Sequence, residues 1–206
     1  MKKIISTLIR FTVMNLCVFT LASCSFLSPV KTDVANKYLL NKLPDHVPTK
    51  VTRPIILLVS IPETRPIFNT TQMAYTKNPY QVSYFSQNQW AETPIEMLQP
   101  LLVQTLQNTH HFKAIVTPPF IGQYHYSLNT QLLELVQDYT HRTPLLLMSV
   151  KVQIIKTSTN QVIGTRQFSV TQPIPQASPY GGVYAANQAT AHILERIAEF
   201  CLEKIK

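Results

Sequence analysis

Glycine is scarce in this chain, cysteine is scarcer, and charged residues are few. The 206 residues include four glycines, three cysteines and one tryptophan, and 14% of them are charged. The glycines (Gly122, Gly164 and the pair Gly181-Gly182) lack the spacing of a nucleotide-binding loop, which excludes a glycine-rich phosphate site. The 18 lysines and arginines outnumber the 10 aspartates and glutamates, which gives a net charge of +8. The lysines and arginines are scattered along the chain, so the sequence predicts no nucleic-acid-binding patch and at most a weak attraction to anionic membrane surfaces.

The few cysteines exclude a disulfide framework. Cys17 lies in an apolar N-terminal segment and Cys24 follows that segment, so only Cys201 remains in the body of the chain. One thiol cannot form an internal disulfide. Cys201 falls on the apolar side of a predicted helix, and we therefore expect it to be a small buried hydrophobic residue.

The N-terminal segment has the layout of a secretory signal. Lys2, Lys3 and Arg10 precede a mostly apolar run from residue 11 to residue 21. The run ends in Leu21, Ala22, Ser23 and Cys24, a tetrapeptide that resembles the lipobox of bacterial lipoproteins, in which the cysteine is acylated. An uncleaved membrane anchor or plain secretion are the alternatives, since residues 4–22 are nearly long enough to span a bilayer. The preferred division is a signal peptide over 1–23, a lipidated tether over 24–35 and a folded domain over 36–206.

The sequence predicts no catalytic residue, no cofactor and no metal. Glu92 and Glu96 lie beside a helix start, where a carboxylate has a capping role. The four histidines that invite a metal site have no cysteine or acidic partner at ligand spacing; they are His110, His111, His125 and His141. The Gly-x-Ser-x-Gly string of a serine hydrolase is absent from the chain. We therefore expect a protein that is not an enzyme.

The order of elements predicts a single α+β domain with a mainly antiparallel sheet covered by two helices. Strands are expected at 37–43, 55–61, 70–75, 80–85, 112–116, 124–136, 146–155 and 162–171. The first helix should run from Pro94 to about Asn108 behind a Thr93–Glu96 capping box. A loop over 173–182 and a long helix over 184–204 complete the prediction.

Three aromatic residues are candidates for docking a partner, because aromatic side chains are enriched in interface cores. Trp90 precedes the first helix, and packing against that helix is its competing interpretation. Tyr180 and Tyr184 flank the glycine pair in a segment predicted to be a flexible loop, with an ordinary loop as the alternative.

Several local runs follow one another in order behind the lipobox. They are Ile55-Ile56-Leu57-Leu58-Val59, Met73-Ala74-Tyr75, Gln89-Trp90-Ala91, Phe112-Lys113-Ala114-Ile115-Val116 and Tyr184-Ala185-Ala186-Asn187-Gln188-Ala189. This order resembles the ABC-type transport auxiliary lipoproteins, the family that includes PqiC-like partners of MCE-domain transport proteins. The resemblance covers nearly all of the chain after the lipobox. The histidine pair before Phe112 departs from the pattern, where a small residue or glycine is expected.

The resemblance implies a non-catalytic lipoprotein anchored to the outer membrane and facing the periplasm, with Ser25 after the cysteine as an outer-membrane sorting choice. Its implied partners are an MCE-domain periplasmic protein and an ABC transporter permease and ATPase, in lipid transport across the envelope. A homo-oligomer around a conduit is compatible with this role. A lipid-carrying or export-assembly lipoprotein of another envelope machine is the alternative.

Overall fold

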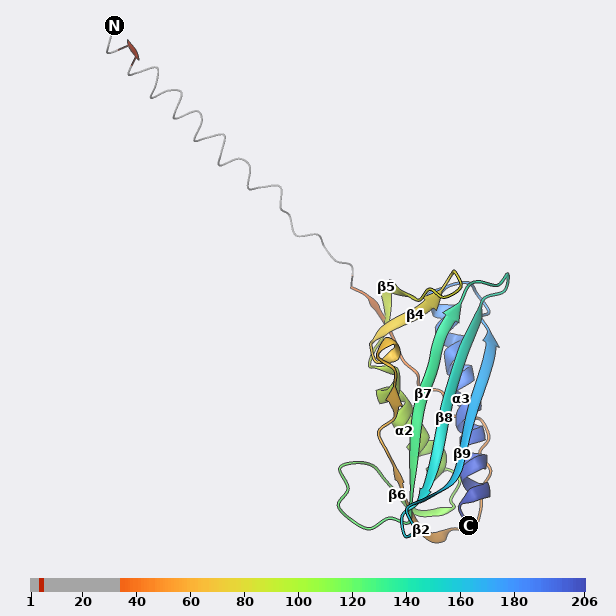
Figure 1. The fold of residues 1–206 in the computed structure, drawn as a ribbon. Helices are drawn as coiled ribbons and strands as arrows, with labels where there is room; N and C mark the ends of the chain where they lie inside the picture. Colours follow the sequence, from red (N-terminus) through yellow and green to blue (C-terminus); the bar gives the residue numbers. More distant parts are fainter. Residues whose placement is uncertain (1–3, 6–33) are drawn as a thin grey trace. The chain divides into compact units, whose positions relative to one another are not determined.

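Strand β7 (Tyr126–Asp138) organises the sheet, because strands from several parts of the chain pair with it. The structure is a computed structural model that describes residues 4–5 and 34–206 (Figure 1). One edge of β7 pairs in parallel with β2 (Arg53–Val59), then with β3 (Glu63–Thr64), then with β4 (Gln72–Thr76). The other edge pairs with β8 (Leu145–Lys156), which is antiparallel. Three successive segments of the chain therefore add to one edge of one strand in chain order.

Four further strands extend this sheet. Strand β5 (Ser83–Trp90) is antiparallel to β4, and β1 (Asn36–Tyr38) is parallel to β5. Strand β6 (Phe112–Val116) is parallel to β2, and β9 (Gln161–Pro173) is antiparallel to β8. Among the described residues, nine strands form one sheet. Its long ladders, β7 with β8 and β8 with β9, are antiparallel as predicted, but the parallel pairings at the other strands make the sheet mixed.

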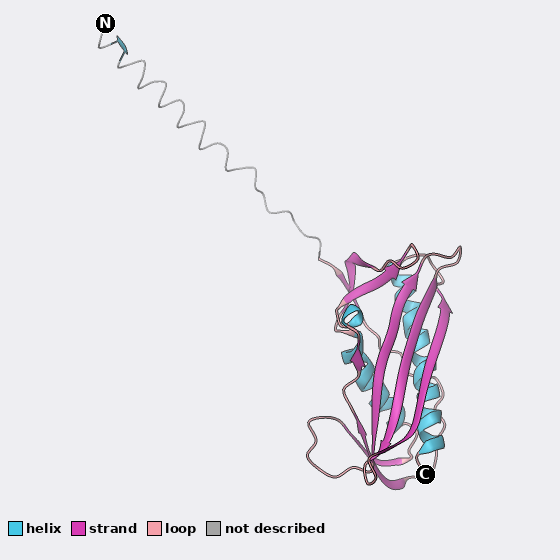
Figure 2. Cartoon of the chain, in the orientation of Figure 1, coloured by secondary structure: helices cyan, strands magenta, loops and turns pink. Residues whose placement is uncertain are grey.

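Two α-helices lie on one face of the sheet in the described domain, as Figure 2 shows. Helix α2 (Pro94–Gln107) packs near β2 and β6, and α3 (Pro179–Lys204) packs against β8 and β9. A short 3₁₀ helix (Pro66–Phe68) follows β3. The capping box of α2 forms through one carboxylate, since Glu96 Oε2 accepts from the Thr93 backbone N–H at 2.9 Å and from its hydroxyl at 2.7 Å. The predicted α+β class is confirmed.

The core lies between the helices and the sheet. Along β8, the buried Val150, Val152 and Ile154 alternate with the exposed Lys151 and the half-buried Gln153, which places one face of the strand on the core. Burying each large apolar side chain stabilises the fold by about 1.5–3 kcal/mol. The largest fully buried side chains are Phe168, Phe200, Leu57, Met73, Leu98, Leu102, Leu106, Leu128, Leu132, Leu146, Met148 and Ile154.

The unit Ala35–Lys206 contains this core within itself. Every residue of the hydrophobic cluster lies between Leu40 and Ile205. A unit with its own core can in principle fold alone, so we expect residues 35–206 to fold without the N-terminal segment.

Several predicted boundaries change in the structure. The β8–β9 hairpin and β6 lie where they were predicted, whereas β1 is shorter than the run predicted from residue 37 to residue 43. Strand β5 begins later than predicted and continues to Trp90. Helix α3 begins at Pro179, so the prediction of a loop up to residue 182 is wrong.

Candidate functional site

The lipobox residues Leu21, Ala22, Ser23 and Cys24 lie outside the described residues. Acylation of Cys24, the signal peptide over 1–23 and most of the tether over 24–35 therefore stay predictions. The site that the structure describes is the end of the domain where the chain enters it, at β1.

Behind β1 the chain runs along helix α3 as an extended strap, defined as residues 39–50. The strap is fixed at its start by the side chain of Asn187, in the third turn of α3. It is fixed at its end by Lys50, whose Nζ donates to the Leu202 carbonyl at 3.1 Å. Leu202 is one of the last carbonyl groups of α3, where a cation is favoured by the helix dipole. The buried Leu40 anchors the strap in the core.

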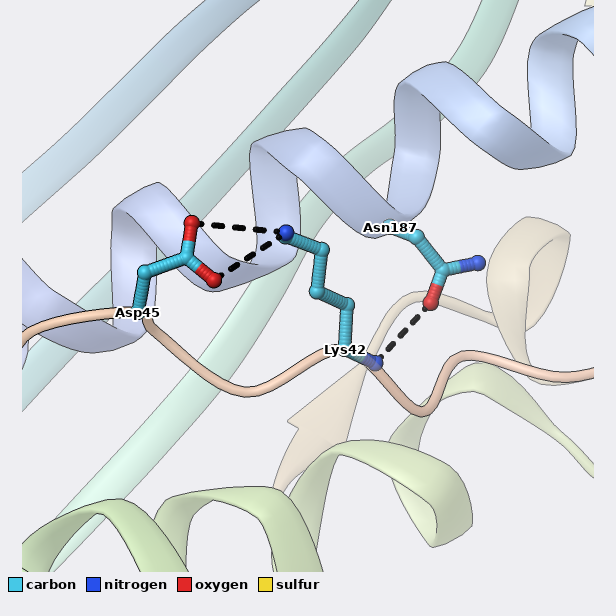
Figure 3. Close-up of polar contacts among 3 residues, drawn as sticks. All are labelled: Lys42, Asp45 and Asn187. Atoms are coloured by element: carbon cyan, nitrogen blue, oxygen red, sulfur yellow. Dashed lines mark hydrogen bonds and ion pairs between the residues drawn. The ribbon is translucent and has the colours of Figure 1, made fainter.

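Asn187 holds the strap through both ends of its amide. Its Oδ1 accepts from the backbone N–H of Lys42 at 3.0 Å, as Figure 3 shows, and from that of Asn41 at 2.9 Å. Its Nδ2 donates to the Leu39 carbonyl at 2.9 Å. An extended backbone presents both N–H donors and carbonyl acceptors, and the side-chain amide of Asn187 can bind both kinds of group. The Lys42–Asp45 ion pair at 3.3 Å lies on the surface beside it and adds little, because exposed pairs are screened by water.

Tyr180 and Tyr184 lie beside this strap on the first turns of α3. Their side chains are 62% and 52% exposed, and residues four apart on a helix share one face. The ring of Tyr180 lies 6.1 Å from the ring of Tyr38 in β1. The two tyrosines that the sequence proposed for docking are thus brought together with β1, on a rigid helix and not on the flexible loop that was predicted.

The early start of α3 has a clear physical cause. Ser178 is the N-cap, its hydroxyl accepts from the Gly181 backbone N–H at 3.1 Å, and Pro179 occupies the first helical position. Gly182 is buried where a Cβ would overlap the side chain of Gln137 in β7. Glycine lowers helix propensity, but here its small size permits close packing of the helix on the sheet. The stabilisation from that packing exceeds the cost in helix propensity.

A shallow groove of about 490 Å³ lies between the strap and α3. Tyr184 lines it, together with polar and charged side chains of both signs from the strap (Lys42, Asp45 and His46) and from the helix (His192 and Glu195). Mixed charge and one aromatic ring suit a protein surface better than a small apolar ligand, because protein interfaces combine an aromatic centre with a polar rim.

Trp90 is not part of this exposed surface. It is 3% exposed and belongs to the hydrophobic core, at the end of β5, where it pairs in register with Tyr38. The proposal that Trp90 docks a partner is therefore corrected: packing is the interpretation that the structure supports, since its ring is already covered.

The polar residues considered for chemistry have structural contacts instead. His111 Nε2 lies 3.1 Å from the Ile205 carbonyl, His125 Nδ1 accepts from the Ile56 N–H at 3.0 Å, and His141 lies 3.5 Å from Asp138. Hydrogen bonds from Thr93 lower the pKa of the exposed Glu96 carboxyl. Within the described residues, no three His, Cys, Asp or Glu side chains gather as a metal site would require.

Cys201 is buried in α3, as predicted. Burial in apolar surroundings raises the pKa of its thiol to about 12. Since the thiolate is the reactive form, this cysteine is inert at neutral pH. No helix in the described part of the chain is long and apolar enough to cross a membrane.

Two solved structures share this fold. A protein from Xanthomonas campestris superimposes with a TM-score of 0.72 at 17% identity, over 83% of this chain and 95% of that chain. A second, uncharacterized protein gives a TM-score of 0.66 at 16% identity, over 82% of this chain and 99% of that chain. A PelC dodecamer from Paraburkholderia phytofirmans gives a TM-score of 0.46 at 14% identity, over 74% of this chain and 94% of that chain. No curated relative matches the chain.

Sequence comparison with protein families extends the likeness beyond fold. The model of the ABC-type transport auxiliary lipoprotein component matches residues 38–198. The match starts in β1, includes the strap and α2, and ends within α3, so it covers the elements that carry Tyr38, Tyr180 and Tyr184. The chain belongs to the family of ABC-type transport auxiliary lipoprotein components.

Proposed function

We propose that this protein is a non-catalytic lipoprotein of the outer membrane that faces the periplasm and serves an ABC/MCE-type lipid transport system. The observation that carries the proposal is the family match across residues 38–198, together with the lipobox-like sequence that ends at Cys24. The partners are an MCE-domain periplasmic protein and, through it, the permease and ATPase of the transporter. Copies of the chain assemble around the conduit in this proposal.

Acyl chains on Cys24 supply the attachment to the membrane. Each buried methylene contributes about 0.8 kcal/mol, so one chain gives reversible binding and two or more give lasting attachment. Confining the domain to a membrane raises its effective concentration near a partner by orders of magnitude, so that modest contacts are enough for docking.

Tyr180 and Tyr184 supply the centre of the docking surface. They are exposed, they stand on one face of α3, and α3 is fixed to the sheet by close packing at Gly182. A rigid aromatic pair loses little conformational entropy on binding, which favours its use as an interface anchor. The strap held by Asn187 forms the polar rim of this surface.

Paired substitutions test the docking surface. Tyr180→Ala with Tyr184→Ala should greatly reduce recovery of MCE-domain and ABC subunits in a pull-down from native envelopes, because two anchor rings are lost. Tyr80→Asn is the matched control, since Tyr80 is fully exposed, lies in the turn before β5 and has a φ of 65° that asparagine tolerates. Equal recovery with both variants would remove these tyrosines from the interface.

A separate experiment tests the anchor. Palmitate labelling should be lost in Cys24→Ala, and the protein should move from the outer-membrane fraction to the soluble periplasmic fraction. Labelling that persists in this variant contradicts the proposal. Phospholipid that co-purifies with the domain of residues 35–206, detected by mass spectrometry, would instead favour a lipid-carrying protein.

A further inference from the structure

The lysines and arginines are scattered in the sequence, but the fold gathers five of them at one end of the domain. They come from four different places: the strap and the start of β2, the start of β6, the end of β8, and the residues after α3. We call this group the basic tip, and its members are Lys50, Arg53, Lys113, Lys156 and Lys206. Lys206 lines one groove with Lys50 and Arg53 and a second groove with Lys156, and the register of β2 with β6 pairs Arg53 with the residue before Lys113. In Figure 1 this end carries the labels β2, β6 and C and lies where α3 ends, whereas the start of α3 lies at the other end of the domain.

The basic tip has little compensating negative charge. Two grooves of about 1000 and 720 Å³ open there, and Glu203 is the one acidic side chain among the described residues that line them. Glu203 is already paired with Lys204 at 2.8 Å and with Arg166 at 3.3 Å. None of the ion pairs found among the described residues includes a member of the basic tip.

Exposed apolar side chains lie among these cations. Ile121 is fully exposed and Phe120 is 38% exposed, both on the loop between β6 and β7 that projects from this end in Figure 1. Val51, between Lys50 and Arg53, is 86% exposed. Gly122 of the same loop lines one groove with Lys156 and Lys206, and Val51 lines the other with Lys50 and Arg53. Large apolar groups on projecting segments close to cations have the chemical character of segments that bind the interfacial region of a lipid bilayer.

We propose that the basic tip binds a membrane surface rich in anionic phospholipid, with its cations on the lipid phosphates and Ile121 inserted among the headgroups. The tip and the docking tyrosines are held at opposite ends of α3, a helix of 26 residues and about 39 Å. The domain therefore has two separate binding ends. This inference depends neither on the lipid anchor nor on the transport partners of the proposed function.

A lipid surface fits the tip better than an acidic protein does. The cations belong to separate elements and line two different grooves, so they do not form a fixed clamp for particular carboxylates. Mobile phosphate headgroups can adjust to such an arrangement, and the bilayer also accepts the apolar side chains. A folded acidic partner would need matched positions for each charge and an apolar pocket for Ile121.

Vesicle sedimentation with the folded domain of residues 35–206 tests this inference. The domain should bind vesicles of equal parts phosphatidylglycerol and phosphatidylcholine, and hardly bind vesicles of phosphatidylcholine alone. Each cation near an anionic surface contributes about fivefold, so Lys113→Gln with Lys156→Gln should weaken binding about 25-fold. Lys37→Gln with Arg142→Gln is the control, with the same charge change on exposed residues away from the tip, and should weaken binding less than about threefold.

The apolar contribution has its own pair of variants. Ile121→Ser should weaken binding about tenfold, whereas Ile61→Ser, which removes an exposed isoleucine beyond the end of β2, should have no effect. Equal losses from tip and control variants, or equal binding to both kinds of vesicle, overturn the proposal. So does a result in which tip variants bind vesicles normally but lose an envelope protein, because the tip then serves a protein partner.

Discussion

Replacing Asn187 by alanine should release the strap from α3 and destabilise the domain. The side chain makes three hydrogen bonds to the strap, to the backbone of Leu39, Asn41 and Lys42. Each such bond contributes about 0.5–1.5 kcal/mol, and water can reach part of this exposed backbone in the variant. We therefore expect a loss near the low end of the total, about 2 kcal/mol.

Urea unfolding measures this loss. A domain of this size has a slope of about 2 kcal/mol per molar urea, so Asn187→Ala should lower the midpoint by about 1 M with an unchanged slope. The single tryptophan is a suitable probe, because Trp90 is buried and pairs in register with Tyr38, just before the strap. Its fluorescence reports whether the strap and the core unfold together.

Two further variants separate the clamp from general surface effects. Asn187→Asp keeps the acceptors for the Asn41 and Lys42 N–H groups but places an oxygen against the Leu39 carbonyl, so its stability should lie between wild type and Asn187→Ala. Gln188→Ala changes the neighbouring helix residue, whose side chain makes no hydrogen bond within the described part of the chain. The urea midpoint of this variant should match that of wild type. A midpoint for Asn187→Ala equal to that of Gln188→Ala refutes the clamp.

Three other outcomes are expected. Glu96→Ala should lower the thermal stability of the domain at neutral pH. Because the pKa of the Glu96 carboxyl is lowered in the folded state, the difference in stability between this variant and wild type should vanish as the pH falls through that pKa. A difference in stability that does not depend on pH contradicts the capping role. Cys201 has a pKa of about 12, so it should resist thiol reagents in the folded domain at pH 8 and should react once denaturant is added. Rapid labelling of the native protein would show instead that α3 opens. Gly182→Ala should destabilise the domain by about 1–3 kcal/mol, measured by urea unfolding, because its methyl group displaces the buried Gln137. An unchanged urea midpoint contradicts the close packing of α3 on β7.

The sequence predicts best those elements whose signals are local. Helix α2 follows from a capping residue and apolar periodicity, and the β8–β9 hairpin follows from alternation on both sides of a turn. The parallel pairing of β2, β3 and β4 with β7 joins residues far apart in the chain, and no local pattern encodes it. The short strand β3 has only two residues and offers no periodicity at all.

The candidate site was predictable in part. Tyr180 and Tyr184 are exposed, as their glycine-containing segment led us to expect, and their docking role stays a prediction. The segment is helical because Ser178 and Pro179 form an N-terminal cap that the glycine pair obscured. Trp90 was misplaced because the sequence does not say whether an aromatic ring is covered. Asn187 had no distinguishing signal, since a polar residue on an exposed helix face gives no indication of the backbone that it binds.

The way β7 collects its partners bears on how this domain can act. Strands β2, β3 and β4 follow one another along a single edge of β7, so the residues beside β2 and those beside β4 are fixed to opposite ends of one continuous strand. Helix α3 spans the same two ends on the covered face, and the strap runs along the helix between Asn187 and Leu202. With strand, helix and strap all joining the two ends, a shift of one end relative to the other would break core packing in every layer. We therefore expect binding at the docking tyrosines to change the orientation of the whole domain without changing its internal structure, and hydrogen exchange in β7 should be the same with and without partner.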